Sequence, residues 1–356
     1  MKTGFLTLAT LLAFAAPLTP AGAQTAPDLP AAGKTVFLPY LNAPLAGDPI
    51  THPPALSLSI GGRAVRATMD TGSTGIVVAA RLIPDLDTLP VVGPGTLTYT
   101  SSGRVMTGDW VMAPVTIAGT NGAEVTTRPM PVLAVKRVDC LKTARNCKPR
   151  MDPTGIAMLG VGFARQGDRQ MQSAPDRNPF LSLPDMGSVD KPGAMRRGYM
   201  VTKRGVTLGL NPDTAKDFSF IKLEKSKDFP DWAATPACLS LAGRQPPACG
   251  TALVDTGVST MYLTLPPEQQ AGQIARGADG KRALNAGARL DIAFGAPGGP
   301  AYGFAVGDRT NLLAPEHIVL VPHAHRVFVN TSVRLLNGFD YLYDADGGFV
   351  GFRARK

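Results

Sequence analysis

The stretch MDTGSTG at residues 69–75, with its near repeat VDTGVST at residues 254–260, decides the fold of this chain. In both places an Asp, a Thr and a Gly follow directly after an apolar run. A single Asp-Gly turn is common in proteins. The same phrase twice, each time after an apolar strand, indicates instead a structural unit that is duplicated at long range.

The sequence around both phrases alternates between apolar and polar residues, as strands with one buried face do. Long helical patterns are scarce, and the 39 Gly and 32 Pro residues indicate frequent turns. We therefore expect a mostly β protein. The strands and hairpins are expected at residues 55–74, 95–119, 155–163, 196–210, 238–266, 288–306 and 333–355, with a short strand at 35–41 and a short helix at 178–183.

Both halves of the chain follow the same outline of hairpins, the Asp-Thr-Gly phrase, and a later apolar strand that ends in Gly. Asp70 lies 90 residues before Gly160, and Asp255 lies 83 residues before Gly338. A chain of 356 residues also suits two domains better than one core. We predict two similar β lobes with a cleft between them, and these segments: a signal peptide at 1–23, a lead-in at 24–50, an N-terminal lobe at 51–197 and a C-terminal lobe at 198–356.

The first 23 residues have the features of a secretory signal peptide. Lys2 gives a positive start, residues 4–17 form an apolar run too short to span a bilayer comfortably, and Ala21-Gly22-Ala23 is a small-residue cleavage site. We expect an exported protein, periplasmic or secreted, with no membrane anchor after cleavage. An uncleaved membrane anchor is the alternative interpretation of the same residues.

Four cysteines fit an exported protein, because disulfides persist in oxidising compartments. They are Cys140, Cys147, Cys238 and Cys249, for which three connectivities exist. They form two local pairs far apart in the sequence, which favours bonds 140–147 and 238–249. A zinc site is the alternative, but the chain has no C-x-x-C spacing and no His close in sequence to either pair.

The chain is basic, with a formal net charge of +9. The densest basic segment spans residues 136–150, and we expect it to be a solvated loop closed by the first cysteine pair. Single-stranded nucleic acid binding usually combines basic residues with aromatic ones, and this segment has none. We expect no nucleic acid partner.

The two Asp residues predict the chemistry. Two carboxylates within hydrogen-bond reach do not both ionise easily, so they share a proton. The ionised member takes a proton from water, while the protonated member donates to a carbonyl oxygen. We predict that Asp70 and Asp255 form such a catalytic pair.

The neighbours of the two Asp residues are expected to support them. Gly72 and Gly257 allow tight turns that bring N–H groups close to a carboxylate. The hydroxyls of Thr71 and Thr256 are expected to bond across to the opposite strand. Ser73 has a hydroxyl that donates to the outer oxygen of Asp70.

With these residues in view, the chain from about residue 35 to residue 356 resembles a two-lobed, pepsin-like aspartic peptidase of family A1, of the exported bacterial type. The two Asp-Thr-Gly phrases match the active-site loops of that family. MLG at 158–160 and LLNG at 335–338 resemble the strands that cross behind those loops. The resemblance implies peptide-bond hydrolysis in the cleft, no metal, no other cofactor and a monomer.

The segment TYTSSGRVMTG at residues 98–108 resembles the flap hairpin of the same family. Tyr99 then matches the flap tyrosine that closes over a bound peptide, with Thr100 and Ser101 beside it at the substrate. The Cys238–Cys249 pair resembles a disulfide often found just before the second motif.

Two residues depart from the family pattern. Val258 stands where the family usually has Thr or Ser, so we expect the outer oxygen of Asp255 to lose a hydrogen-bond donor and the local pKa to rise. Val77 stands where a Trp commonly steadies the flap tyrosine, so we expect Tyr99 to be less restrained.

Other functions find less support in the sequence. His323 and His325 lie two apart, but no acidic or Cys ligand is obvious beside them, so a metal pair is not favoured. The chain has no G-x-S-x-G nucleophile motif and no glycine pattern for binding nucleotides. Two alternatives to a general endopeptidase stay open. One is a catalytically weak or inactive protein that binds peptides, and the other is a protease that processes itself or a single target.

Overall fold

The computed structural model describes residues 26–355 apart from 145–146, 169, 171–172, 189, 278–279 and 323–325. The predicted signal peptide at 1–23 and the His323–His325 pair lie outside the described residues. Among the described residues, no helix is long and apolar enough to cross a membrane.

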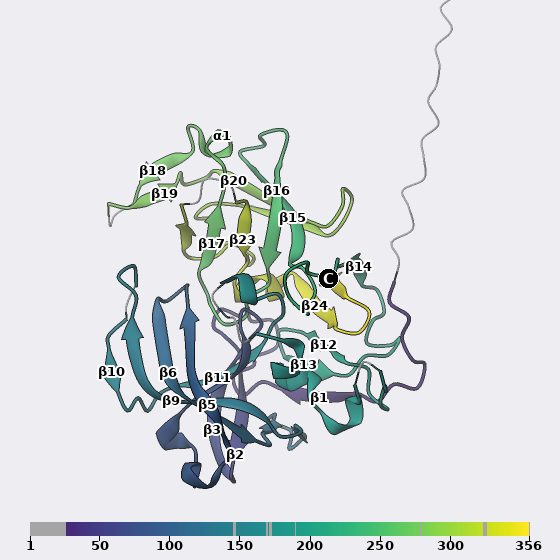
Figure 1. Ribbon diagram of the computed structural model, residues 1–356. Helices are drawn as coiled ribbons and strands as arrows, with labels where there is room; N and C mark the ends of the chain where they lie inside the picture. Colours follow the sequence, from purple (N-terminus) through teal and green to yellow (C-terminus); the bar gives the residue numbers. More distant parts are fainter. Residues whose placement is uncertain are drawn as a thin grey trace, which may run out of the picture.

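The first half of the chain forms a ten-stranded sheet, which occupies the lower left of Figure 1. Its order is β5-β6-β9-β4-β11-β3-β2-β7-β8, with β10 paired to β9. The strands are β2 (Ala55–Ile60), β3 (Arg63–Asp70), β4 (Thr74–Ala79), β5 (Val91–Tyr99), β6 (Arg104–Ala113), β7 (Thr116–Ala118), β8 (Glu124–Thr126), β9 (Met130–Cys140), β10 (Arg150–Met151) and β11 (Ala157–Val161).

The second half forms a seven-stranded sheet at the top of Figure 1, in the order β21-β20-β15-β16-β23-β17-β22. Beside it lie a two-stranded hairpin and one short helix. These elements are β15 (Thr235–Leu241), β16 (Ala248–Leu253), β17 (Met261–Thr264), α1 (Pro267–Gln270), β18 (Ile274–Arg276), β19 (Arg282–Leu284), β20 (Arg289–Phe294), β21 (Ala301–Ala305), β22 (Ile318–Leu320) and β23 (Phe328–Asn330).

A six-stranded sheet joins strands from the start, the middle and the end of the chain, in the order β1-β13-β12-β24-β25-β14. Figure 1 shows these strands on the right, where the chain also ends. They are β1 (Val36–Pro39), β12 (Gly198–Val201), β13 (Gly205–Leu208), β14 (Ser219–Lys222), β24 (Phe339–Asp344) and β25 (Phe349–Ala354). The predicted lobe boundary near residue 198 stays a prediction, because this sheet takes strands from both sides of it.

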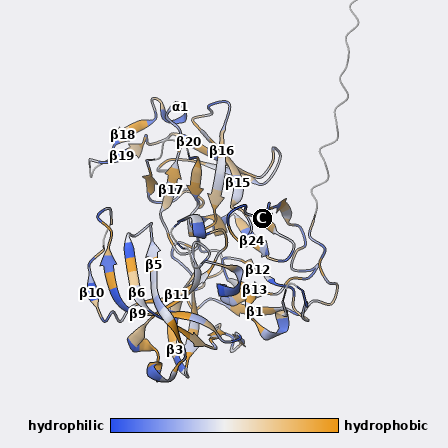
Figure 2. Ribbon diagram, in the orientation of Figure 1, coloured by the Kyte–Doolittle hydropathy of each residue, from blue (hydrophilic) through white to orange (hydrophobic). Residues whose placement is uncertain are grey.

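The apolar alternation in the sequence accounts for the core. Figure 2 shows apolar and polar bands alternating along β6 and β9. The largest buried cluster runs through all three large sheets and includes Leu56, Leu159, Tyr199, Leu239 and Val350. Because one core reaches both halves, the two Asp-Thr-Gly loops rest on a common apolar base.

Each half has one strand that crosses between the two strands flanking its Asp-Thr-Gly loop. In the first half, β11 pairs in parallel with β3 and antiparallel with β4. In the second half, β23 pairs in parallel with β16 and antiparallel with β17. The two crossing strands give both loops the same support.

The prediction for the second crossing strand was therefore wrong. Residues 335–337 form the end of a 3₁₀ helix at Val333–Asn337, Gly338 caps it, and the strand that crosses behind the loop is β23. The pattern of two apolar residues before Gly fits a buried 3₁₀ turn as well as a strand, because both bury consecutive side chains.

Two smaller expectations also changed. The basic segment at 136–150 is a loop only in part, since Lys136 and Arg137 lie in β9 and Arg150 begins β10. The helix expected at 178–183 is one 3₁₀ turn at Pro179–Leu181, for which Asn178 caps the first turn through the N–H of Phe180.

Candidate active site

The two Asp-Thr-Gly loops meet at the middle of the molecule. Asp70 is the last residue of β3, and Asp255 follows two residues after β16. Each of these residues is only 5% exposed. The structure brings the two carboxyl groups close together, as the sequence predicted.

The two loops are tied together by their threonines. The N–H of Thr71 donates to Oγ1 of Thr256 at 3.1 Å, and the N–H of Thr256 donates to Oγ1 of Thr71 at 3.0 Å. Each hydroxyl also donates to a carbonyl of the opposite strand, that of Thr71 to Val254 at 2.6 Å and that of Thr256 to Met69 at 2.8 Å. This reciprocal arrangement is the predicted bonding across the loops, and it holds both Asp residues at a fixed separation.

Asp70 accepts two hydrogen bonds from its own loop. The N–H of Gly72 donates to Oδ1 at 2.7 Å, and the hydroxyl of Ser73 donates to Oδ2 at 2.5 Å. Both contacts agree with the sequence prediction. Hydrogen bonds to a carboxylate favour its ionised form.

Asp255 has the same inner contact but a different outer one. The N–H of Gly257 donates to Oδ1 at 2.8 Å. The side-chain amide of Asn330, at the end of β23, donates to Oδ2 at 2.5 Å. The expectation that Val258 leaves this oxygen without a donor was therefore wrong, because a strand 75 residues further along supplies one.

The glycines of the two loops are required by the opposite carboxyl groups. A Cβ atom on Gly72 would lie 2.3 Å from Cγ of Asp255, and one on Gly257 would lie 2.3 Å from Oδ1 of Asp70. No side chain fits at either position. The two carboxyl groups therefore face one another across backbone that only Gly allows.

The shared site changes the acidity of Asp255. Burial raises its pKa well above the usual value, and the charge of Asp70 and a hydrogen bond to its carboxyl group raise it further. The amide of Asn330 and the charge of Arg165 act in the opposite direction. The net direction for Asp255 is upward, as expected for one of two buried carboxyl groups that share a proton.

The hairpin of β5 and β6 extends over this pair. Tyr99 ends β5, and burial raises the pKa of its phenol, with the charge of Asp70 adding to the effect. Its hydroxyl is buried beside Ser73, which acts to lower the pKa of the phenol, but it makes no hydrogen bond of normal geometry to a described residue. Val77 lies in the apolar cluster on which Tyr99 packs. The expectation that Val77 leaves Tyr99 less restrained stays a prediction.

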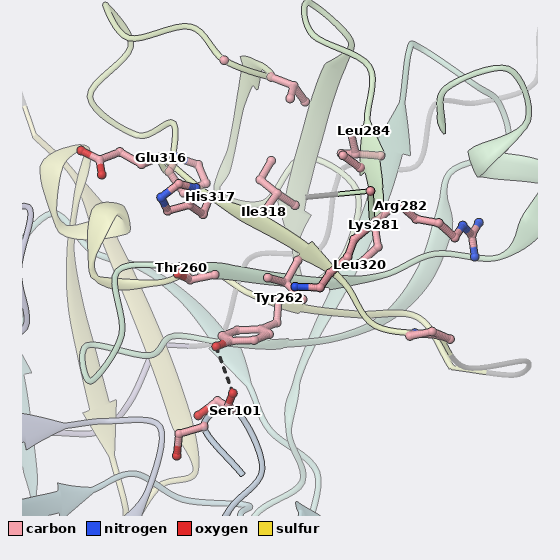
Figure 3. A pocket seen from close by; sticks show the side chains of 18 of the residues that line it. Ser101, Thr260, Tyr262, Lys281, Arg282, Leu284, Glu316, His317, Ile318 and Leu320 are labelled. Carbon is pink, nitrogen blue, oxygen red and sulfur yellow. Dashed lines mark hydrogen bonds between the residues drawn. The ribbon is translucent and has the colours of Figure 1, made fainter. Parts of the chain in front are cut away.

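The tip of this hairpin touches both halves of the molecule. The hydroxyl of Thr100 lies 3.3 Å from the carboxylate of Asp168 in the first half. The hydroxyl of Tyr262, in β17 of the second half, donates to the carbonyl of Ser101 at 3.3 Å (Figure 3). The hairpin therefore bridges the cleft between the two halves.

A pocket of about 1130 Å³ opens beside the hairpin tip. Figure 3 shows that its walls come from β17, β19 and β22, with Ser101 at the lower edge. Its lining mixes apolar and polar side chains, among them Tyr262, Lys281, Leu284, His317, Ile318 and Leu320. Its volume is close to the upper end of the range for ligand pockets in proteins.

Both predicted disulfides are present. Bonds join Cys140 to Cys147 and Cys238 to Cys249. The second one links β15 to β16, the strand that leads into the second Asp-Thr-Gly loop. Within the described part of the chain no group of three or more His, Cys, Asp and Glu residues is placed to hold a metal ion.

Comparisons with known proteins identify the fold. No protein-family model and no curated protein sequence matches this chain. Its structure is similar to the crystal structure of an aspartic proteinase from Irpex lacteus, with a TM-score of 0.58. The chain has a pepsin-like aspartic proteinase fold. The similarity covers 91% of this chain and 98% of the fungal one, at 13% sequence identity, so it shows the fold and not the activity.

Sequence reasoning missed three side chains at this site, namely Asn330, Arg165 and Tyr262. Asn330 ends the apolar run VFV, which is a weak sign of a strand that delivers an amide to the second loop. Arg165 lies in a glycine-rich turn and Tyr262 in an ordinary strand. No local signal marked either residue.

Proposed function

We propose that this chain is an aspartic endopeptidase that hydrolyses peptide bonds with a water held between Asp70 and Asp255. The observation that carries the proposal is the paired site itself. Each carboxyl group has one backbone and one side-chain donor, and each faces the other across a glycine. A protein that only binds peptides has no chemical need for this symmetry.

In the proposed first step Asp255, whose pKa is raised, carries the proton that the pair shares. Asp70 removes a proton from the water as the water oxygen attacks the peptide carbonyl carbon. Asp255 donates its proton to the carbonyl oxygen, which gives a neutral tetrahedral diol. The buried site strengthens both interactions, because water does not screen them.

The second step returns both protons. Asp70 passes its proton to the amide nitrogen while the C–N bond breaks, and one diol hydroxyl gives its proton back to Asp255. The products are a carboxylic acid and an amine, and no covalent enzyme intermediate forms. The chemistry uses no metal and no other cofactor.

A peptide substrate lies extended beneath the β5–β6 hairpin in this proposal, with some of its side chains in the pocket beside Ser101 and Tyr262. An extended peptide presents its backbone to the hairpin and its side chains to alternate sides. We propose that one chain is sufficient, since both carboxyl groups come from it, and that no nucleic acid takes part.

We also propose that the protein acts outside the cytoplasm, in the periplasm or the medium. Two disulfides favour an oxidising compartment, and the first 23 residues have the sequence features of a signal peptide. Val258 and Val77 were the two reasons to consider an inactive binding protein, and Asn330 removes the first of them by supplying the donor.

The test is cleavage of casein from pH 3 to pH 8 by the wild-type chain and by Asp70→Asn, with and without a statine-type peptide that mimics the tetrahedral diol. We expect cleavage by wild type alone, and its loss in the variant and with the mimic. Cleavage that persists in Asp70→Asn would contradict the proposal. Absence of cleavage with tight binding of the mimic would favour a binding or single-target function instead.

A further inference from the structure

Arg165 is a buried cation beside the catalytic pair, and the chemistry proposed above does not use it. It lies in the turn after β11, and only 6% of its side chain is exposed. Its Nε donates to the carbonyl oxygen of Gly72, in the first Asp-Thr-Gly loop, at 2.9 Å. A buried charge is costly unless it is paired and hydrogen-bonded. The contacts of Arg165 therefore need to be accounted for.

The backbone directs this side chain inward. The preceding residue, Ala164, has a φ of +57°, in the left-handed region that non-glycine residues seldom adopt. Its N–H donates to the carboxylate of Asp231 at 2.8 Å, and this contact holds the turn. Unusual backbone of this kind is retained where the surrounding structure fixes it, often at functional sites.

The guanidinium of Arg165 also pairs with Asp168. The same carboxylate lies 3.3 Å from the hydroxyl of Thr100 at the tip of the β5–β6 hairpin. A continuous set of polar contacts therefore runs from the carbonyl of Gly72, through Arg165 and Asp168, to the hairpin that covers the site.

The charge of Arg165 reaches the catalytic pair. The charged and titratable groups that act on Asp255 are Asp70, Arg165 and the phenol of Tyr99, and Arg165 is the cation among those described. It lowers the pKa of Asp255, against the effect of burial and of Asp70. A nearby cation favours the singly ionised form of two coupled carboxyl groups over the fully protonated form.

We propose that Arg165 is a positioning residue that couples the covering hairpin to the catalytic pair, through Gly72 on one side and Asp168 with Thr100 on the other. This inference rests on the proposed peptidase function. Closing of the hairpin over a peptide orders Thr100 and Asp168, and the ordered ion pair holds Gly72 and the charge beside Asp255 in place.

The test compares Arg165→Gln, Arg165→Lys and Thr100→Val with a matched control, Arg177→Gln. Arg177 lies in the same half of the molecule and packs over the ring of Trp110 in β6 at 4.9 Å. For each variant, kcat and KM are measured on one peptide from pH 3 to pH 8. Thermal unfolding is measured in the same buffers.

We expect Arg165→Gln to lower kcat by about 10- to 100-fold, the worth of a hydrogen bond to a charged group. We also expect the alkaline limb of its pH profile to move to higher pH, because loss of the cation raises the pKa of Asp255 further. Arg165→Lys keeps the charge and should restore the position of that limb. Thr100→Val should raise KM a few-fold with an unchanged pH profile, and Arg177→Gln should change neither.

A merely structural role predicts a different result. If Arg165→Gln lowers only the unfolding temperature, and kcat and the pH profile stay as in wild type, the proposal is wrong. Binding of the statine-type mimic over the same pH range, measured by calorimetry, tests the coupling even if wild type cleaves no peptide. If wild type cleaves no peptide, the peptidase function is wrong. If, in addition, binding of the mimic depends on pH in the same way in Arg165→Gln and in wild type, the coupling through Arg165 is wrong as well.

Discussion

The two Asp-Thr-Gly loops have the same backbone contacts but different outer donors. In both, a Gly N–H bonds the inner oxygen and a Thr hydroxyl bonds the opposite strand. The outer oxygen of Asp70 is bonded by Ser73, three residues away, whereas that of Asp255 is bonded by Asn330, 75 residues away. One lobe uses its loop for this contact, and the other uses its crossing strand.

The crossing strands explain this difference. In the first half, Gly160 lies against the loop, and a Cβ there would lie 2.8 Å from the hydroxyl of Ser73. Strand β11 carries no side chain at this position because the loop fills the space. In the second half Val258 brings no hydroxyl, and Asn330 fills that role from the strand side. The carboxyl group keeps its donor while the element that supplies it changes.

The largest expected effect is loss of the carboxyl groups themselves. We expect Asp70→Asn and Asp255→Asn each to lower kcat by at least about 1000-fold, because each removes one partner of acid–base catalysis. Steady-state cleavage of a fluorogenic peptide measures this. Asp228→Asn, at an exposed site, is the control and should cleave normally. A variant of the pair that keeps a tenth of the wild-type activity would contradict the assignment.

The Asp255→Asn variant should also change how stability depends on pH. The folded protein holds the proton of Asp255 more tightly than the unfolded chain, whose pKa is near 3.8. The free energy of unfolding should therefore fall in wild type as the pH rises from about 3.8 toward the raised pKa. The variant should lack this fall. Urea unfolding at several pH values measures the difference, and parallel curves for both proteins would contradict the raised pKa.

The next largest effect is expected when the hydrogen-bond donor to the outer oxygen of Asp255 is removed. Asn330→Ala removes the donor to Asp255, so we expect kcat to fall by about 10- to 100-fold and the alkaline limb of the profile to move to higher pH. Adding Val258→Thr to this variant places a hydroxyl where the first loop has Ser73, and it should restore part of the activity. No rescue, with a normally folded double variant, would show that the two lobes are not interchangeable in this way.

Loss of the threonine of either Asp-Thr-Gly loop should lower the stability of the protein to a similar extent. Thr71→Val and Thr256→Val each leave a buried N–H of the other loop without its acceptor, which costs about 1–3 kcal/mol. We expect a lower unfolding temperature by several degrees in both, to a similar extent. Thr120→Val, at an exposed position, is the control. A large difference between the two loop variants would show that the loops are not mechanically equivalent.

The smallest effects on stability and KM are expected for Tyr99, in the hairpin, and for Tyr262, which contacts its tip. The hydroxyl of Tyr99 is buried without a hydrogen-bond partner among the described residues, so Tyr99→Phe should not lower the free energy of unfolding. The hydroxyl of Tyr262 bonds Ser101, so Tyr262→Phe should raise KM for a peptide. Peptide kinetics and urea unfolding of both variants compare them, and equal KM values would remove the role of Tyr262 in closing the cleft.

The sequence predicted much of this site because its key contacts are local. Asp70, Gly72 and Ser73 lie within four residues, so one phrase contains a whole half of the site. The cysteine pairs were found for the same reason, since each closes a short loop. The error at residues 335–338 came from a pattern that a strand and a 3₁₀ turn share.

Arg165 and Asn330 show what a sequence does not display. Each contacts a residue 75 to 93 positions away, and neither stands in a pattern that marks it. Their roles depend on which strand crosses behind which loop and on how a turn is bent. Such facts follow from sheet pairing, which a local pattern does not specify.

By itself, then, the sequence determined the duplicated β architecture, the two acidic residues and the cysteine pairs, because these are repeated or local. The tertiary structure alone decided which group bonds the outer oxygen of Asp255, where the crossing strand of the second half lies, and that a buried Arg links the first Asp-Thr-Gly loop to the hairpin. The physical reason is the separation along the sequence. Contacts between residues that are far apart in the sequence form only when the sheets assemble around one core.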